Sequence, residues 1–487
     1  MEEVKRLLKD SAPARWAVLI LISGLMFGTN WFQDCLGPLK GMFESQLGFT
    51  SSQFGTLVSS TTWANLALMI IVGGIALDKW GIRKTGLIFG VIATVGAFVV
   101  ALGSKGSFGE NRLLPMIIGR LLFGIGLETT CVLINRTVVK WFKGYELALA
   151  MGLNVVVGRM GTFGAVSFGV DIAHGDVSVA LVTAASLIGV GFLFFLAYLI
   201  FDVKYDKQLA ATTEGAKGDD FKFSDLVKLL TDRSFIFIAL LCVFFYSAVF
   251  PFIQYAPDLL VNKFGFSSAM PSLVGLSLWE KIAAYVSNGP KVTGLIPLGT
   301  IIFTPLFGRV VDKKGKAASL MILGSLLLIY AHLTLSIFNS VVLGYTGLFA
   351  LGIGFALVPA AMWPSVAKIV PENRLGTAYA TMFTIQNYGL SAFYWGIGKV
   401  LDVSNPTVVS KIQEVRSSLE AQGLSGTEIA SQIDSMKLAG EIPIYNYTTP
   451  ILMLVGLGIV SIFLAYQLKA ADKKQSYGLE MPSNHAA

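Results

Sequence analysis

The chain has 487 residues, of which 54% are hydrophobic and 14% are charged, whereas soluble domains average about 25% charged residues. This composition excludes an ordinary soluble enzyme and favours a protein with many membrane-spanning helices of about 20 residues each. The net charge of +7 does not indicate nucleic-acid binding, because the basic residues are spread over short connections and form no stripe interleaved with aromatic residues.

Apolar runs long enough to cross a membrane occur in two groups of six. The expected spans of the first group are 16–36, 55–77, 85–103, 114–137, 146–168 and 178–201. Those of the second group are 235–260, 292–311, 317–337, 342–366, 376–400 and 447–468. No cleavage site precedes the first run, so we expect it to remain as a membrane helix. The sequence therefore predicts an all-α membrane protein with twelve transmembrane helices in two pseudo-symmetric six-helix bundles.

Polar segments between these runs divide the chain. We expect an N-terminal bundle over 1–201, a cytoplasmic linker over 202–234, a C-terminal bundle over 235–470 and a cytoplasmic tail over 471–487. Two long extracytoplasmic insertions, 261–291 and 401–446, are expected to contain short surface or soluble helices, which form either a lid or partner surface or simply tolerated insertions. Most Lys and Arg residues fall on the side of the termini, so the positive-inside rule places both termini in the cytoplasm.

One sequence motif occurs once in each half of the chain. Residues 74–84 are GIALDKWGIRK and residues 308–316 are GRVVDKKGK, so that a glycine, an acid, a base and a second glycine recur at the same spacing. A long internal repeat in an apolar chain is typical of transporters built from two related halves. We interpret Asp78, Arg83 and Asp312 as latches that hold inner helix ends together in one state without touching the substrate.

The two six-helix halves and this loop after spans 2 and 8 resemble the major facilitator superfamily. Arg120, four residues before Gly124, is similar to the superfamily's motif in span 4. We expect Arg120 to bridge helices or to bias a nearby acid rather than to bind substrate. The resemblance implies the major facilitator fold, in which one bundle rocks against the other around a central site.

A narrower resemblance concerns segments 119–128, 141–147 and 158–161. They look like the lysosomal dipeptide-transporter branch of the superfamily and its bacterial relatives. In that branch an acid on span 4 and an arginine on span 5 hold the two ends of a dipeptide. The resemblance places these roles on Glu128 and Arg159.

Glu128 and Arg159 are also unusual on physical grounds. Counted from the inner ends of spans 4 and 5, both lie near mid-membrane, where a charge costs about 2.5–3.5 kcal/mol on insertion scales. Either they neutralise each other in a structural bridge, or a zwitterion neutralises both. A guanidinium grips a carboxylate with two hydrogen bonds and a carboxylate accepts from an ammonium, so a dipeptide suits the pair. In the second half Asn387 aligns with Arg159, so we expect the substrate chemistry to be concentrated in the first half.

Further polar residues in the spans are candidate cavity groups, with packing between helices as the alternative for each. They are Asn135, Asn154, Trp363, Gln386, Asn387, Tyr388 and Tyr394. Asp34, near the outer end of span 1, is either a gate or proton carrier or a surface or helix-capping acid, and Glu128 is the second candidate for proton coupling. The three cysteines and three histidines form no metal-ligand spacing or catalytic set, so we expect neither an enzyme nor a cofactor or metal site.

The sequence thus predicts a monomeric alternating-access secondary transporter of small zwitterions, with dipeptides as the leading substrate and with uniport or proton coupling. An organic-anion exchanger of the same superfamily is the alternative, in which Arg159 and Arg120 clamp a carboxylate. A non-transporting membrane receptor or scaffold is a remoter one. The expected partners are the small-molecule substrate and membrane lipids. The expected location is the inner membrane of a bacterium, or the lysosomal or plasma membrane of a eukaryote.

Overall fold

The structure is a computed structural model that describes residues 7–210, 228–371 and 374–482. The long helices of the first half are α1 (Ala12–Asp34), α3 (Ser51–Leu66), α4 (Met69–Ser104), α5 (Leu113–Phe142), α6 (Leu147–Ala173) and α7 (Val177–Ala210). Those of the second half are α9 (Arg233–Phe264), α12 (Leu295–Lys314), α13 (Ala317–Ser336), α14 (Val341–Ile369), α15 (Leu375–Ser404) and α18 (Thr448–Gln475). The described residues contain no β-strand.

Short helices complete the chain. The connection from α1 to α3 contains η2 (Gly37–Leu39) and α2 (Lys40–Leu47), and η1 (Leu8–Asp10) precedes α1. The two predicted insertions contain α10 (Leu278–Val286) and α11 (Gly289–Thr293), and α16 (Pro406–Ala421) and α17 (Gly426–Leu438), respectively. The expectation of helices in both insertions is therefore confirmed.

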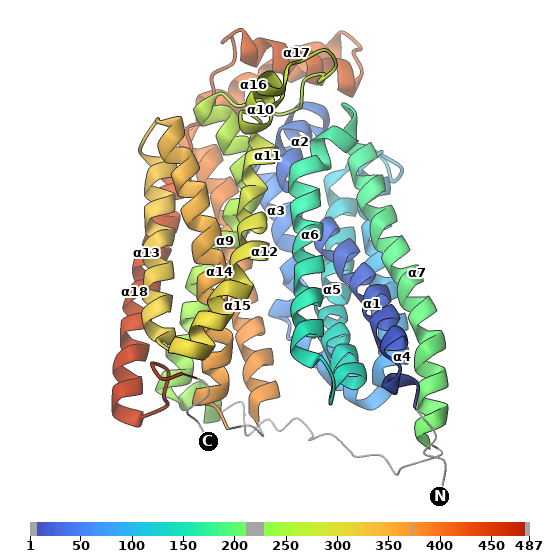
Figure 1. Ribbon diagram of the computed structural model, residues 1–487. Helices are drawn as coiled ribbons and strands as arrows, with labels where there is room; N and C mark the ends of the chain where they lie inside the picture. Colours follow the sequence, from blue (N-terminus) through green and yellow to red (C-terminus); the bar gives the residue numbers. More distant parts are fainter. Residues whose placement is uncertain (1–6, 211–227, 372–373, 483–487) are drawn as a thin grey trace, which may run out of the picture.

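The two halves form two bundles that stand side by side, with both termini at one end and α10, α16 and α17 at the other (Figure 1). We call these ends the terminal side and the far side. Across the boundary between the bundles, α3 packs against α15, and α6 packs against α11 and α12. Towards the terminal side the ribbons of the two bundles diverge (Figure 1).

The predicted spans are present, although the helices do not all follow the expected limits. Ten described helical segments are long and apolar enough to cross a membrane. The other two passages are α3, which continues into the first part of α4 after a break at Leu68, and α15, which is more polar. The predicted span 55–77 is thus α3 plus the beginning of α4, because α4 itself turns at Gly81 and contains the next span as well.

The repeated segments 74–84 and 308–316, which we call the doubled loop, each need a glycine at the second glycine position because of the backbone conformation there. Gly81 has φ 72° and Gly315 has φ 67°, a left-handed conformation that side chains with a Cβ rarely adopt. Each glycine ends one span of its bundle and lets the chain turn into the next. The repeat therefore encodes the same tight turn in both halves.

A second repeated pair marks close helix contacts. A Cβ on Gly124 would lie 1.9 Å from the backbone oxygen of Thr61 on α3, and one on Gly126 would lie 2.4 Å from that of Phe89 on α4. Their counterparts Gly352 and Gly354 approach the backbones of α12 and α13 in the corresponding places. Both halves consequently pack their fourth span against the second and third through small residues.

Two expected boundaries shift. Helix α7 continues to Ala210, so residues 202–210 are helical, and residues 211–227 of the expected linker lie outside the described part. Of the expected tail, the segment up to Gln475 belongs to α18, and the next residues dock on the bundle. Leu479 is fully buried, and the Glu480 carboxylate accepts from the backbone N–H of Ser319 at 2.9 Å in the first turn of α13. Residues 483–487 lie outside the description.

Candidate substrate site

Arg159 projects from α6 of the first bundle towards the second bundle. Its guanidinium carbon lies 4.8 Å from the ring centroid of Phe355 on α14 and 5.7 Å from that of Phe250 on α9. The side chain is half-buried, and within the described part of the chain it forms no hydrogen bond or ion pair. A guanidinium resting on rings keeps its in-plane N–H groups available. Arg159 can therefore present its bidentate fork to a carboxylate.

The rings near Arg159 belong to a larger aromatic cluster of the second bundle. Tyr246 stacks on Phe250 with ring centroids 5.3 Å apart, and its hydroxyl accepts a hydrogen bond of 3.0 Å from the indole of Trp363. Trp363 in turn stacks on Phe383 at 4.9 Å. Trp363 was predicted as a cavity residue, and the structure puts it in this cluster. Its neighbours Tyr246 and Phe250 were not predicted, because aromatic residues in an apolar span have no distinguishing pattern.

Glu128 on α5 is half-buried and lies near the side-chain amide of Asn387 on α15. Asn387 also accepts a hydrogen bond of 3.4 Å from Asn65 on α3, so that a small polar group spans both bundles. Within the described residues, Glu128 and Arg159 form no ion pair with each other. The structural-bridge alternative is therefore not realised in this conformation. Asn65 was not predicted, since nothing in its local sequence sets it apart.

Asp34, the last residue of α1, is buried between the two bundles. Its carboxylate accepts 2.7 Å from the Thr162 hydroxyl on α6 and 3.0 Å from the Gln254 amide on α9. With only 5% of its surface exposed, Asp34 is not a surface acid. It lies close enough to Arg120 and Arg159 to interact electrostatically with both. This placement fits a group that joins the bundles and adjoins the candidate site.

Arg120 is fully buried and hydrogen-bonds to the backbone of α1. It donates to the backbone oxygens of Phe32 at 3.1 Å and Gln33 at 3.3 Å, near the far-side end of that helix. Its guanidinium also lies 5.5 Å from the ring centroid of Phe123. These contacts agree with the expected bridging role. They also occupy donors that a carboxylate clamp formed with Arg159 would need.

The remaining predicted cavity residues do not gather at one place. Asn154 accepts 3.1 Å from Ser23 in a buried contact between α6 and α1, and Gln386 accepts 3.3 Å from the Cys242 thiol. The Tyr388 hydroxyl donates 2.7 Å to the Leu66 backbone across the bundle boundary. Tyr394 is buried, and its backbone oxygen accepts 2.9 Å from Tyr255. Asn135 is exposed. Asn154 and Gln386 are thus packing contacts, whereas Tyr388 joins the bundles.

The predicted latch residues do not connect the bundles on the terminal side. Asp78 pairs with Arg136 of the same bundle, and Arg83 pairs with Asp202 of α7 at 2.7 Å. Asp312 is exposed and has no ion pair among the described residues. Each ion pair that the structure describes on this side stays within one bundle. A latch that closes the terminal side in another conformation remains a prediction.

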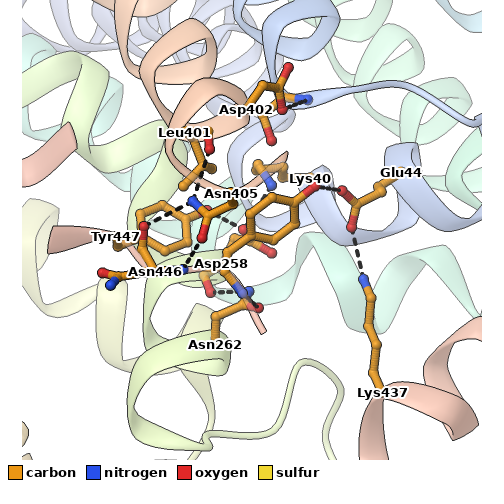
Figure 2. Close-up of polar contacts among 12 residues, drawn as sticks. Lys40, Glu44, Asp258, Asn262, Leu401, Asp402, Asn405, Lys437, Asn446 and Tyr447 are labelled. Atoms are coloured by element: carbon orange, nitrogen blue, oxygen red, sulfur yellow. Dashed lines mark hydrogen bonds and ion pairs between the residues drawn. The ribbon is translucent and has the colours of Figure 1, made fainter. Parts of the chain in front are cut away.

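On the far side, by contrast, three ion pairs join the bundles. They are Lys40–Asp258, Glu44–Lys437 and Asp171–Lys291. Figure 2 shows the first two around α2, where Lys40 approaches Asp258 to 2.8 Å and Lys437 approaches Glu44 to 2.8 Å. Lys40 and Glu44 are almost fully buried, so these contacts are not ordinary surface pairs.

Insertion 401–446 completes this closure, and we call its contacts with the first bundle the far-side clasp. Asp402 accepts 3.1 Å and 2.7 Å from the backbone N–H groups of Ser51 and Ser52, which begin α3. Arg416 on α16 donates 2.9 Å to the backbone oxygen of Ser45 at the end of α2. The insertion therefore contacts the first bundle at the far side, and a role as a lid remains a prediction. Sequence reasoning did not identify these partners.

Comparisons with known proteins agree with this architecture. Residues 18–394 match the family model of the Major Facilitator Superfamily. The "Lysosomal dipeptide transporter MFSD1" of Homo sapiens is 30% identical over 80% of this chain and 80% of its own length, and that of Danio rerio is 29% identical over 80% and 81%. A hexuronate transporter of Bacillus subtilis is 22% identical over 78% of this chain and 85% of its own.

Solved structures show the same fold at low sequence identity. A mutant of the nucleoside transporter NupG has a TM-score of 0.66 with 14% identity, over 93% of this chain and 99% of its own. A bacterial homolog to the human lysosomal transporter Spinster has a TM-score of 0.64 with 14% identity, over 95% and 98%. The relatives and neighbours are membrane transporters, which confirms the predictions of a twelve-helix multi-pass fold and of a transporter rather than an enzyme. The chain belongs to the Major Facilitator Superfamily.

Proposed function

We propose that this protein moves small zwitterions, with dipeptides as its substrates, by alternating access between the two bundles. The observation that carries the proposal is the pair Glu128 and Arg159. Both are half-buried charges of the first bundle, they are not paired with each other, and both face the second bundle, where Arg159 contacts Phe355 and Glu128 lies near Asn387. A zwitterion placed between them would neutralise one charge at each end.

Two further findings support this proposal. The relatives at 29–30% identity are named lysosomal dipeptide transporters. The aromatic cluster around Tyr246 and Trp363 belongs to the second bundle and lies beside Arg159 of the first bundle. At this place it can contact variable side chains of a substrate. We further propose that both termini are cytoplasmic, so that the far-side clasp closes the extracytoplasmic or lumenal side and the described conformation faces inward.

The first test compares one dipeptide in three forms: free, N-acetylated and C-amidated. The free form should raise the melting temperature of the purified protein, because a ligand that binds the folded state stabilises it. Each capped form should not, because it leaves Glu128 or Arg159 without its counter-charge. Glu128→Gln should restore tolerance of N-acetylation, and Arg159→Lys should weaken binding of every carboxylate ligand because it removes the bidentate fork.

The same experiment separates the alternative function. The alternative is a carboxylate exchanger, a function similar to that of the hexuronate transporter among the relatives. Such an exchanger would accept the N-acetylated form as readily as the free dipeptide. If stabilisation survives N-acetylation in the unmodified protein, the dipeptide proposal is wrong. Glu110→Gln, on the exposed connection between α4 and α5, is a matched control that should leave all three responses unchanged.

A further inference from the structure

Helix α10 carries an apolar face that the described chain covers only in part. At 3.6 residues per turn, Leu278, Trp279, Ile282, Tyr285 and Val286 fall within an arc of about 120°. Leu278 is 69% exposed and Trp279 is 78% exposed, while the other three are 42–47% exposed. None of the nine residues of α10 is buried. The apolar arc is therefore exposed over much of its surface, most of all at Leu278 and Trp279.

A helix of this length needs an environment that stabilises it. Isolated helices shorter than about 12–15 residues are marginal in water. Ser277 and Glu280 form a capping box that supports the first turn, and the Tyr345 hydroxyl donates to the Val286 backbone at the other end. These contacts fix the ends of α10 but leave its apolar arc in contact with the surroundings.

The other insertion behaves in the opposite way. Helices α16 and α17 turn their apolar residues inward, where Ile412, Leu419 and Ile433 are at most 7% exposed. Their outer surfaces are polar. The two insertions are therefore folded for different surroundings: α16 and α17 for water, and α10 for something apolar.

The position of α10 indicates what covers it. Tyr345, which holds its C-terminal end, lies in the second turn of α14, and the start of α14 exposes Val342 at 70%. The turn before α14 exposes Phe338 at 48%. A 29-residue helix is about 43 Å long, more than the roughly 30 Å of hydrocarbon, so its ends reach the interface with water. The C-terminal end of α10 thus adjoins exposed apolar residues at the far-side end of α14.

We propose that α10 is an interfacial helix that lies in the membrane leaflet of the far side. Its apolar arc, led by Trp279, inserts among the lipids, and Glu280 stays in the aqueous layer. Tryptophan and tyrosine are enriched at this depth, and an amphipathic helix with one apolar face is suited to lie in the plane of the interface. The neighbouring apolar residues at the start of α14, a helix long enough to span the membrane, favour membrane over a protein partner.

This placement bears on the closed far side. Helix α10 leads directly into α11, where Lys291 pairs with Asp171 of the first bundle. A helix held in the leaflet would fix this part of the second bundle relative to the membrane plane. The first bundle would then be the part that moves when the Asp171–Lys291 pair opens.

The test uses an environment-sensitive fluorophore attached to single cysteines in the full chain, with Cys35, Cys131 and Cys242 replaced. The protein is placed in phosphatidylcholine and phosphatidylglycerol nanodiscs, which leave both faces open to an aqueous quencher. Trp279→Cys and Ile282→Cys report on the apolar arc. Glu280→Cys is the matched control, since the Ser277 hydroxyl still caps the Glu280 backbone N–H at 3.3 Å.

Labels at Trp279 and Ile282 should be shielded from iodide several-fold relative to the label at Glu280. They should also be quenched by lipids that carry a nitroxide near the headgroup. Equal iodide quenching at all three positions would overturn the proposal. Shielding from iodide without quenching by the nitroxide lipid would also overturn it, because it would mean that a protein, either a second copy or a partner, covers the arc. The two arc positions report independently, so a folding defect in one leaves the other to decide.

Discussion

At the scale of single residues, the described contacts of Arg159 are aromatic, and this determines how the guanidinium is held. A charge resting on rings is stabilised while its hydrogen-bond donors remain free, which a salt bridge would not allow. In the proposed function, Phe355 would therefore position Arg159 for the substrate carboxylate. Its role is distinct from that of Arg159, which would bind the carboxylate directly.

Phe355→Leu should weaken binding of carboxylate ligands by roughly 2- to 30-fold, the equivalent of the 0.5–2 kcal/mol typical of a cation–π contact. Isothermal titration with a free dipeptide measures the change. Phe349→Leu, on the lipid-facing side of the same helix where the ring is 56% exposed, should leave the affinity unchanged. Equal affinities in the two variants would show that the ring does not position Arg159.

Asp34 offers a second prediction at this scale. Asp34→Asn removes the charge that accepts from Thr162 and Gln254, and hydrogen bonds to charged groups contribute about 1.5–3 kcal/mol each. If one such bond is lost, we expect the population of the far-side-closed conformation to fall roughly 10- to 100-fold relative to the far-side-open one. Distance measurements between spin labels on the far-side ends of the two bundles check this. A distance distribution identical to that of the unmodified protein would show that Asp34 does not stabilise the closed far side.

At the scale of elements, hydropathy and the repeat were sufficient to predict the spans and both insertions. They could not place the break at Leu68, because α3 and α4 form one apolar run in which only backbone geometry marks the boundary. Glu128 and Arg159 stood out because a charge in an apolar run is costly. Lys40 and Asp258 did not stand out as partners, since their contact depends on how two distant helix ends meet. Side-chain pairing across the bundles is a property of the fold and not of local sequence.

The far-side clasp gives a prediction for α17. Lys437→Gln leaves the Glu44 carboxylate, which also accepts from the Tyr445 hydroxyl, buried without its counter-charge. Removing one partner of a buried pair costs up to about 3–5 kcal/mol. The melting temperature should fall and the far-side distances should lengthen. The double variant Glu44→Gln with Lys437→Gln should recover most of the loss, and a double variant as impaired as the single one would contradict a specific pair.

The clasp should also show a defined pH dependence. Burial by itself lowers the pKa of the Lys437 ammonium, but the Glu44 carboxylate, together with Asp258 and Asp434, more than offsets burial and raises the pKa above its ordinary value of 10.5. A raised lysine pKa contributes stability that is complete below the ordinary value and is lost as the pH rises through the higher one. The contribution of this lysine should therefore stay constant around neutral pH and disappear only in strongly alkaline solution. The Lys437→Gln variant, followed by the same distance measurement, should lack that alkaline step.

At the scale of the whole molecule, the ion pairs that the described residues form between the bundles are on the far side, and those that they form on the terminal side stay within a bundle. Alternating access requires that this asymmetry be reversed in the other state. Asp78 and Asp312 should then join the helix ends of the terminal side. Asp312 is exposed and unpaired among the described residues, which leaves it available for that contact.

Asp312→Asn should therefore shift the equilibrium towards the described conformation and slow turnover more than it weakens substrate affinity. Labels on the terminal-side ends of the two bundles, followed by distance measurement, report the shift. Arg136→Gln, which frees Asp78 from its partner within the bundle, should act in the opposite direction. If neither variant changes the distance distribution, the doubled loop has only the turn-forming role of its glycines.

The hydrogen bonds from Ser51 and Ser52 to Asp402 have a consequence for how the chain is made. The acceptor lies 350 residues after Ser52, so it does not exist when α3 first enters the membrane. At about 5–20 residues per second, translation reaches Asp402 roughly 20–70 s later. During that interval the first amide groups of α3 must be satisfied by water or lipid headgroups. The first half of the nascent chain therefore lacks part of its final hydrogen bonding. In ribosome-bound chains that stop short of Asp402, the amide protons of Ser51 and Ser52 should exchange rapidly with solvent. In chains that include Asp402, this exchange should be slow.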